Sequence, residues 1–136
     1  VQAARSYIFE FGLADADTPG DDAIVGSVND EQLTGGQGRD TLTGGDGSDR
    51  YIFARGDGLD IIDDRGGGDT DVLHLAGYAP GEVTVQRGLS GSGDFYFTFA
   101  GTTDVLRVIN GFEGNFQNQI EQVTFDDGTI WTPSQV

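Results

Sequence analysis

The middle of the sequence repeats a nine-residue unit without a gap. Residues 35–43 read GGQGRDTLT and residues 44–52 read GGDGSDRYI, with degraded copies on either side. Each unit has an acid at its sixth position and an apolar residue at its eighth. The acids are Asp22, Glu31, Asp40, Asp49, Asp60 and Asp71, and the apolar residues are Ile24, Leu33, Leu42, Tyr51, Ile62 and Leu73. Glycines this dense lose much conformational entropy on folding, and we do not expect a hydrophobic core to be the main compensation.

The two halves of the unit predict different local structures. The glycine-rich half must turn tightly, often with positive φ, and the last three residues form a very short strand with one apolar side chain. A strand this short needs neighbours, so we expect the units to stack and align their eighth positions in one internal column. Stacking also aligns the acids at the turns. Without counter-ions such columns of carboxylates would be strongly destabilising.

Composition restricts the counter-ion and the partners. The chain of 136 residues has 23 Asp and Glu against 7 Lys and Arg, for a net charge of −16. It lacks the basic patch that binds nucleic acid, and it has no Cys and one His, which excludes disulfides and a His-rich zinc site. The available ligands are carboxylate and carbonyl oxygens, which favour Ca²⁺ over Mg²⁺. We find neither an apolar run that could span a bilayer nor a secretory signal peptide.

The repeat resembles a known family. Residues 35–53, GGQGRDTLTGGDGSDRYIF, match the nonapeptide G-G-x-G-x-D-x-U-x of the RTX (haemolysin-type) proteins. The resemblance implies an all-β fold, with a parallel β-roll over residues 17–74 whose successive turns lie on alternate sides. A Ca²⁺ ion then binds between one turn and the next turn on the same side, held by carbonyls and by the two acids.

Carried onto this sequence, the resemblance implies four calcium sites. The first joins Thr18, Gly20 and Asp22 to Gly35, Gln37 and Asp40. The second joins Ser27, Asn29 and Glu31 to Gly44, Asp46 and Asp49. The third joins Gly36, Gly38 and Asp40 to Arg55, Asp57 and Asp60. The fourth joins Gly45, Gly47 and Asp49 to Gly66, Gly68 and Asp71. The sequence departs from the motif at Pro19, at Glu31 and in two-residue insertions near 53–54 and 64–65.

The flanking residues differ from the repeats. EVTVQRG, DFYFTFAG and DVLRVING alternate apolar and polar residues as half-buried strands do, and IEQVTFDDGTIW predicts two strands joined by a tight turn. Asp104–Phe112 and Ile120–Trp131 resemble the segment that follows the repeats in many RTX proteins. We expect residues 75–136 to form a small β-rich cap on the roll and residues 1–16 to form an N-terminal flanking segment, with a strand near residues 6–12.

The resemblance also implies a role. We expect a monomeric, non-enzymatic module that binds several Ca²⁺ ions and folds in extracellular calcium, after unfolded export from a Gram-negative bacterium by the type I secretion machinery. It would be the C-terminal region of a larger secreted or cell-surface protein, such as a toxin or an adhesin. Two alternatives remain: a calcium-rigidified module of an adhesin that binds a sugar or peptide, and a small hydrolase. The adjacent pairs Asp63-Asp64 and Asp126-Asp127 are poor catalytic pairs for a hydrolase, because neighbours on a strand point apart.

Overall fold

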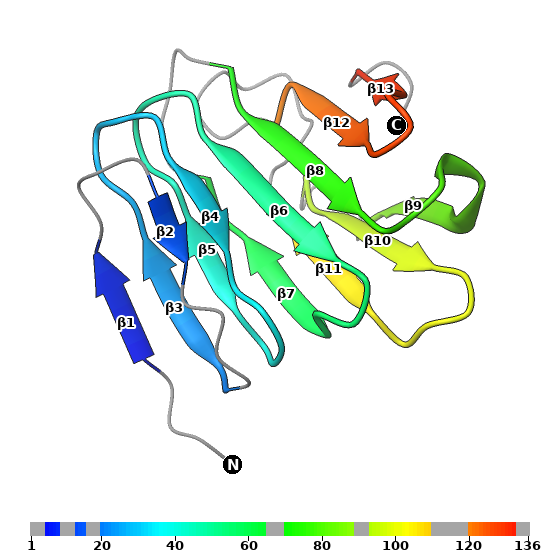
Figure 1. The fold of residues 1–136 in the computed structure, drawn as a ribbon, viewed down its shortest axis with the longest axis horizontal. Coiled ribbons are helices and arrows are strands. Elements are labelled where there is room, and N and C mark those ends of the chain that lie inside the picture. Colours follow the sequence, from blue (N-terminus) through cyan, green and yellow to red (C-terminus); the bar gives the residue numbers. More distant parts are fainter. Residues whose placement is uncertain are drawn as a thin grey trace.

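The described residues of the protein form two β-sheets. The computed structural model describes residues 5–8, 13–15, 20–64, 70–88, 93–109 and 120–132, with side chains from residue 20 onward. The first sheet contains, in order, β1 (Arg5–Ile8), β3 (Asp22–Val25), β5 (Thr41–Thr43), β7 (Leu59–Ile62), β11 (Val105–Val108), β10 (Phe95–Phe99) and β9 (Val83–Arg87). The second contains β13 (Ile130–Trp131), β12 (Gln122–Phe125), β8 (Val72–Ala76), β6 (Arg50–Ala54), β4 (Gln32–Thr34) and β2 (Leu13–Asp15). The described residues contain one three-residue 3₁₀ turn, Pro80–Glu82, and no α-helix (Figure 1).

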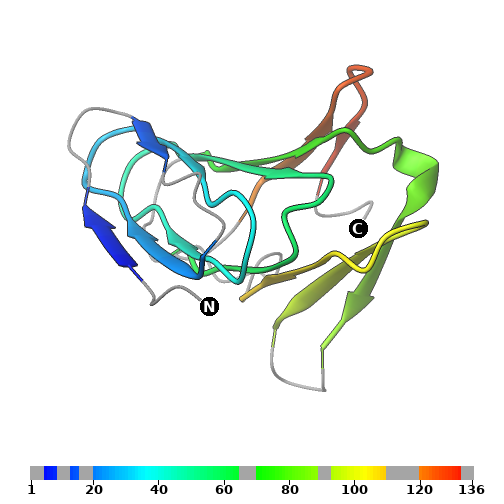
Figure 2. The same cartoon turned by 60° about the horizontal axis from the view of Figure 1, so that its bottom comes forward.

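Consecutive strands of the repeats alternate between the two sheets. β3, β5 and β7 pair side by side in parallel, and β4, β6 and β8 do the same in the other sheet. Each repeat therefore supplies one short strand and one turn that crosses to the opposite sheet, so the chain winds as a flattened coil (Figure 2). The predicted all-β parallel β-roll is confirmed.

The eighth-position residues fill the interior of the coil. The sequence pattern predicted one column of apolar side chains, but the alternation between sheets produces two. They consist of Ile24, Leu42, Ile62 and Val108 in one sheet and Leu33, Tyr51, Leu73 and Val123 in the other, all at most 1% exposed. Each repeat contributes one side chain to these columns, and β6 and β8 bury Phe53 and Leu75 in addition. One repeat alone buries too little apolar surface to fold, so each repeat depends on its neighbours.

The C-terminal strands extend both sheets and form one end of each. β11 pairs in parallel with β7, and β12 pairs in parallel with β8. Antiparallel strands then follow: β10 and β9 extend the first sheet, and β13 ends the second (Figure 1). Three buried aromatic rings stack between the two sheets in this region, those of Phe53, Tyr78 and Phe99. The ring centroids of the two phenylalanines are 5.3 Å apart. The small C-terminal β-rich cap is confirmed.

The predicted boundaries of the roll stay predictions. Parallel stacking crosses both of them, because β1 and β2 pair with β3 and β4, while β11 and β12 belong to the residues assigned to the cap. The predicted N-terminal strand is present as β1, beside the strand of the first repeat. Residues 9–12 of that prediction and the segment GFEGNFQN lie outside the described residues.

Candidate metal centre

Three aspartates stack along one side of the roll. The backbone N–H of Asp22 donates to Oδ1 of Asp40 (2.8 Å), and the N–H of Asp40 donates to Oδ1 of Asp60 (3.1 Å). All three carboxylates are buried. Asp22, Asp40 and Asp60, which we call the first acid column, lie one above the other because β3, β5 and β7 pair in register. The sixth positions are therefore aligned as the repeat predicts.

A second acid column runs along the opposite side. The N–H of Glu31 donates to Oδ1 of Asp49 (2.8 Å), and the N–H of Asp49 donates to Oδ1 of Asp71 (2.8 Å). The column continues into the cap, where the N–H of Asp71 donates to Oε2 of Glu121 (2.6 Å). The second acid column thus consists of Glu31, Asp49, Asp71 and Glu121.

Each hydrogen bond leaves a second carboxylate oxygen to be satisfied. Oδ2 of Asp40, of Asp49 and of Asp60 is fully buried and has no hydrogen-bond partner within the described residues. A buried anionic oxygen without a partner costs several kcal/mol, so native proteins satisfy such atoms with a donor, water or an ion. These three oxygens lie in columns of acids, where a cation would satisfy them best.

Burial also shifts the pKa of these carboxyls. Loss of solvent, with the neighbouring Asp22 carboxylate as a further cause, raises the pKa of Asp40 to about 7. The pKa of Asp49 rises to about 7 for the same reason, with Asp71 and Glu31 nearby. Burial raises the pKa of Asp60 to about 8 beside Asp40. Without a cation, burial and the neighbouring acids therefore favour the protonated form of Asp40, Asp49 and Asp60 more than in an unfolded chain.

Glycines leave the space that the carboxylates occupy. A methyl group on Gly35 would collide with the carboxylate of Asp40, and one on Gly44 would collide with that of Asp49. Turn positions two and four are close-packed on the turn below: a methyl group on Gly45 would lie 2.7 Å from the carbonyl oxygen of Ser27, and one on Gly58 would lie 2.6 Å from that of Gly38. Only glycine fits such contacts, and Gly58 also has a φ of 98°. Backbone carbonyls of stacked turns therefore lie beside the acids.

The donor set fits Ca²⁺. Every candidate ligand is an oxygen, either a carboxylate or a turn carbonyl, which is the set that a hard cation of irregular coordination prefers. The orphaned oxygens of Asp40, Asp49 and Asp60 are the ligands that the roll presents most clearly. When bound, calcium supplies a divalent positive charge that cancels the repulsion within each column.

The structure brings together the predicted partners to different extents. In the first predicted site, Gly20 and Asp22 lie on the turn of Gly35, Gln37 and Asp40, while Thr18 lies outside the described residues. In the third site, Gly38 bridges to Gly58 and Asp40 lies beneath Asp60; Gly36, Arg55 and Asp57 belong to the same two turns. Oδ2 of Asp57 accepts the N–H of Ala54 (2.8 Å). These ligand assignments stay predictions.

The two sites on the second column differ from each other. In the second site, Ser27, Asn29 and Glu31 face Gly44, Asp46 and Asp49, but Glu31 already accepts two bonds from its own turn. The N–H of Ser27 donates to Oε1 (3.0 Å) and the Ser27 hydroxyl donates to Oε2. The longer Glu side chain folds back on its turn instead of leaving one oxygen bare. In the fourth site, the N–H of Asp49 donates to Asp71, Gly45 and Gly47 belong to the turn of Asp49, and Gly66 and Gly68 lie outside the described residues.

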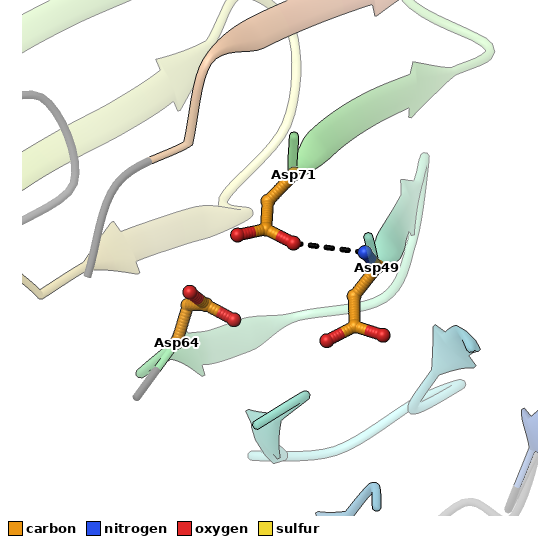
Figure 3. A group of neighbouring side chains, drawn as sticks. All are labelled: Asp49, Asp64 and Asp71. Atoms are coloured by element: carbon orange, nitrogen blue, oxygen red, sulfur yellow. Dashed lines mark hydrogen bonds between the residues drawn. The ribbon is translucent and has the colours of Figure 1, made fainter. Parts of the chain in front are cut away.

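Sequence reasoning missed two acids near the columns. Glu121 lies two residues before the buried Val123, the same spacing that separates Asp71 from Leu73, so the repeat pattern could have identified it. Asp64 carries no repeat signal. Its carboxyl lies with those of Asp49 and Asp71, and one oxygen from each lies within 4.8 Å of the other two (Figure 3). Burial raises the pKa of Asp64 to about 8.

Comparison with protein families gives two matches. RTX calcium-binding nonapeptide repeats (4 copies) match residues 17–51 and 25–60, and the haemolysin-type calcium binding protein related domain matches residues 94–135. The chain therefore carries RTX repeats of the haemolysin type, and these repeats indicate calcium binding. A search of curated proteins gave no match. No helix in the described part of the chain has the length and hydropathy of a membrane-spanning segment.

Proposed function

We propose that calcium binding drives the folding of this chain. The observation that carries the proposal is the buried, unpartnered Oδ2 of Asp40, Asp49 and Asp60, three oxygens of stacked acids that lack a partner within the described residues, inside a chain with a net charge of −16. In the absence of calcium, closing the roll requires these carboxyls to take up protons or to repel one another. A bound ion between stacked turns removes that cost, so binding and folding are coupled.

The expected calcium affinity implies that the chain folds outside the cell. Extracellular calcium modules bind with a Kd of about 10⁻⁴–10⁻³ M. At a few millimolar calcium, each such site stabilises the folded chain by about 1–2 kcal/mol. Several sites together supply a large part of the about 5–15 kcal/mol by which ordinary domains are stable. The same chain would stay expanded in the low calcium of the cytoplasm.

The cellular role follows from this coupling. We propose that the chain is the C-terminal region of a larger protein that a Gram-negative bacterium exports unfolded through type I secretion machinery. The module would be monomeric, secreted or displayed at the cell surface, and without catalytic activity of its own. The RTX repeats support this role, since a chain that folds only in extracellular calcium remains threadable during export.

Far-UV circular dichroism tests the coupling. The chain is prepared in EGTA and titrated with CaCl₂, with MgCl₂ as the control ion. We expect a cooperative change from a coil to a β spectrum near millimolar calcium and no such change with magnesium, which binds poorly in irregular all-oxygen sites. A β spectrum that is the same in EGTA and in calcium would overturn the proposal.

A second candidate function is ligand binding by an adhesin. A surface cavity of about 550 Å³ between the turn before β7 and the turn before β11 is lined by Arg55, Gly56, Gly101, Thr102, Thr103 and Asp104. Its polar side chains could accept a sugar or a short peptide once calcium has made the roll rigid. Glycan or peptide array binding that disappears with EGTA, and with Thr102→Ala, would favour this function over a purely structural role.

A further inference from the structure

The register of the strands places Asp64 at a turn position that is otherwise glycine. Ile62 of β7 pairs with Leu42 of β5, and the N–H of Asp63 donates to the carbonyl of Leu42 (2.9 Å). Asp64 follows Ile62 by two residues, as Gly44 follows Leu42. A methyl group on Gly44 would collide with Oδ2 of Asp49 and with the Tyr51 hydroxyl. Asp64 has the corresponding position in the next turn of the same column, and its carboxylate is buried there.

Tyr51 holds this carboxylate inside the roll. Tyr51 occupies an eighth position, where the other repeats have Ile or Leu, and its side chain is fully buried. The phenol oxygen accepts the N–H of Gly44 (2.9 Å) and donates to Oδ1 of Asp64 (2.6 Å). The extra hydroxyl thus fixes Asp64 toward the second acid column.

An independent observation points to a ligand at this place. Asp49 is 1% exposed, its Oδ1 accepts the N–H of Glu31, and its Oδ2 has no hydrogen-bond partner in the described ranges. Oδ2 lies against Gly44, as does the Tyr51 hydroxyl that binds Asp64, so the unpartnered oxygen faces the Asp64 side. Figure 3 shows the three side chains near one another, with a carboxylate oxygen of Asp71 at the backbone N–H of Asp49.

The spacing of the three carboxyls suits one calcium ion. One oxygen from each residue lies within 4.8 Å of the other two. Two oxygens that share a Ca²⁺ ion at about 2.3–2.6 Å are at most about 5 Å apart, and all three pairs meet this limit. Most of the roll's predicted sites offer two acids, and a third carboxylate raises the calcium affinity of a site.

We propose that Asp64 is a side-chain calcium ligand, held by Tyr51, and that the Asp49–Asp64–Asp71 site is the tightest calcium site of the described chain. The inference rests on the proposed function, because it assumes that calcium enters the second acid column between Asp49 and Asp71. It adds a ligand that the nonapeptide does not contain and assigns Tyr51 a positioning role in addition to its place in the core.

The test compares Asp64→Asn with Asp63→Asn. Both substitutions remove one charge from adjacent residues, but only the first removes a proposed ligand, and the amide oxygen that it introduces can still accept the Tyr51 hydroxyl. Stepwise calcium affinities are measured on the full chain by isothermal titration calorimetry and by competition with a chelating dye. We expect D64N to raise the Kd of the tightest step by about tenfold or more, and D63N to change it by less than about twofold.

A second variant separates ligation from folding. Tyr51→Phe keeps every carboxylate and the aromatic ring but frees Asp64, so we expect it to weaken the same tightest step and leave the other steps unchanged. Identical stepwise affinities for wild type, D64N and Y51F would overturn the inference while leaving calcium-driven folding intact. If D64N does not fold in saturating calcium, Y51F alone decides. Failure of the proposed function looks different, because the wild type would then show the same β spectrum in EGTA and in calcium.

Discussion

At the scale of single residues, the acids in the middle of each column should contribute most to calcium binding. Asp40 accepts the N–H of Asp22 and gives its own N–H to Asp60, so it belongs to the first and third predicted sites. Asp49 has the same position between Glu31 and Asp71 in the second column. Asp60 contributes to one predicted site only. Substitution of a shared acid should therefore cost two ions.

Asp40→Asn should lower the calcium-dependent stability more than Asp60→Asn does. At a few millimolar calcium, we expect a loss of about 2–4 kcal/mol in the free energy of unfolding for D40N and about 1–2 kcal/mol for D60N. The matched control is Asp46→Asn, because Asp46 is exposed and is predicted to bind only through its carbonyl. Urea unfolding in calcium gives the three values. Equal losses for D40N and D46N would show that only net charge matters.

The raised pKa values predict how pH acts on the calcium-free chain. The pKa values of Asp40 and Asp49 rise to about 7, and those of Asp60 and Asp64 to about 8, against about 3.9 for an unfolded Asp. Between about pH 4 and pH 8, the folded chain holds protons on these carboxyls that the unfolded chain has lost. The free energy of unfolding is therefore least affected by these carboxyls below about pH 4, and it falls as the pH rises toward about 8. In calcium-stripped buffer, far-UV circular dichroism should therefore show a larger folded fraction at about pH 5 than at about pH 8. The opposite order would contradict the assignment of buried carboxyls with raised pKa values.

At the scale of the repeat, glycine serves two separate needs. Gly38 and Gly56 both have positive φ, 119° and 93° respectively. A methyl group on Gly38 would also collide with the carbonyl of Gly20, whereas one on Gly56 would meet nothing within 4 Å. The two positions therefore separate backbone strain from close stacking of turns.

Gly38→Ala should destabilise the roll far more than Gly56→Ala. The left-handed backbone costs about 1–2 kcal/mol in either variant. Gly38→Ala must in addition push apart two stacked turns, including the Gly20 carbonyl that is a predicted ligand. Chemical unfolding in calcium should therefore give a clearly larger loss for G38A, with a higher calcium midpoint as well. If both variants lost the same stability, close stacking at Gly38 would be unimportant.

The repeat predicts the regular part of the fold well. The strands around Leu42 and Tyr51, the alternation of turns and the aligned acids all follow from the spacing of the unit, because identical units make identical contacts. The number of apolar columns could not be predicted from the repeat pattern. The pattern gives the spacing of apolar residues along the chain, whereas the two columns arise because each turn carries the chain to the opposite sheet. The cap strands were also predictable, from their alternation of apolar and polar residues.

The candidate site was predicted less completely. Asp64 lies in an insertion, where the nine-residue frame no longer says which residue stacks on which, so its approach to Asp49 depends on the register of β7 against β5. Glu31 has the predicted place but a longer side chain, which folds back to Ser27. Glu121 is distant in sequence from the repeats and joins the column only because β12 pairs with β8.

At the scale of the whole molecule, the cap ends the two acid columns differently. On the first side, Leu106 of β11 pairs with Asp60 of β7, so an apolar residue closes the column. On the second side, Glu121 continues it beyond Asp71. The cap also covers the apolar columns, since Val108 lies on Ile62 and Val123 on Leu73.

A chain that ends at Ala76 should therefore fail to fold in calcium. Removing the cap takes away the strands that pair with β7 and β8 and exposes the last apolar side chains of both columns. Circular dichroism during a calcium titration should show no cooperative transition for this shortened chain. A transition with the midpoint of the full chain would mean that the repeats fold independently of the cap.

A crystal structure of the calcium-loaded chain, with anomalous scattering to identify the ions, tests the central claim most directly. We expect calcium between Asp40 and Asp60 and between Asp49 and Asp71, with Oδ2 of Asp40, Asp49 and Asp60 as ligands at about 2.3–2.6 Å. Water in those places, or carboxyl groups hydrogen-bonded to each other with no anomalous signal in saturating calcium, would contradict it.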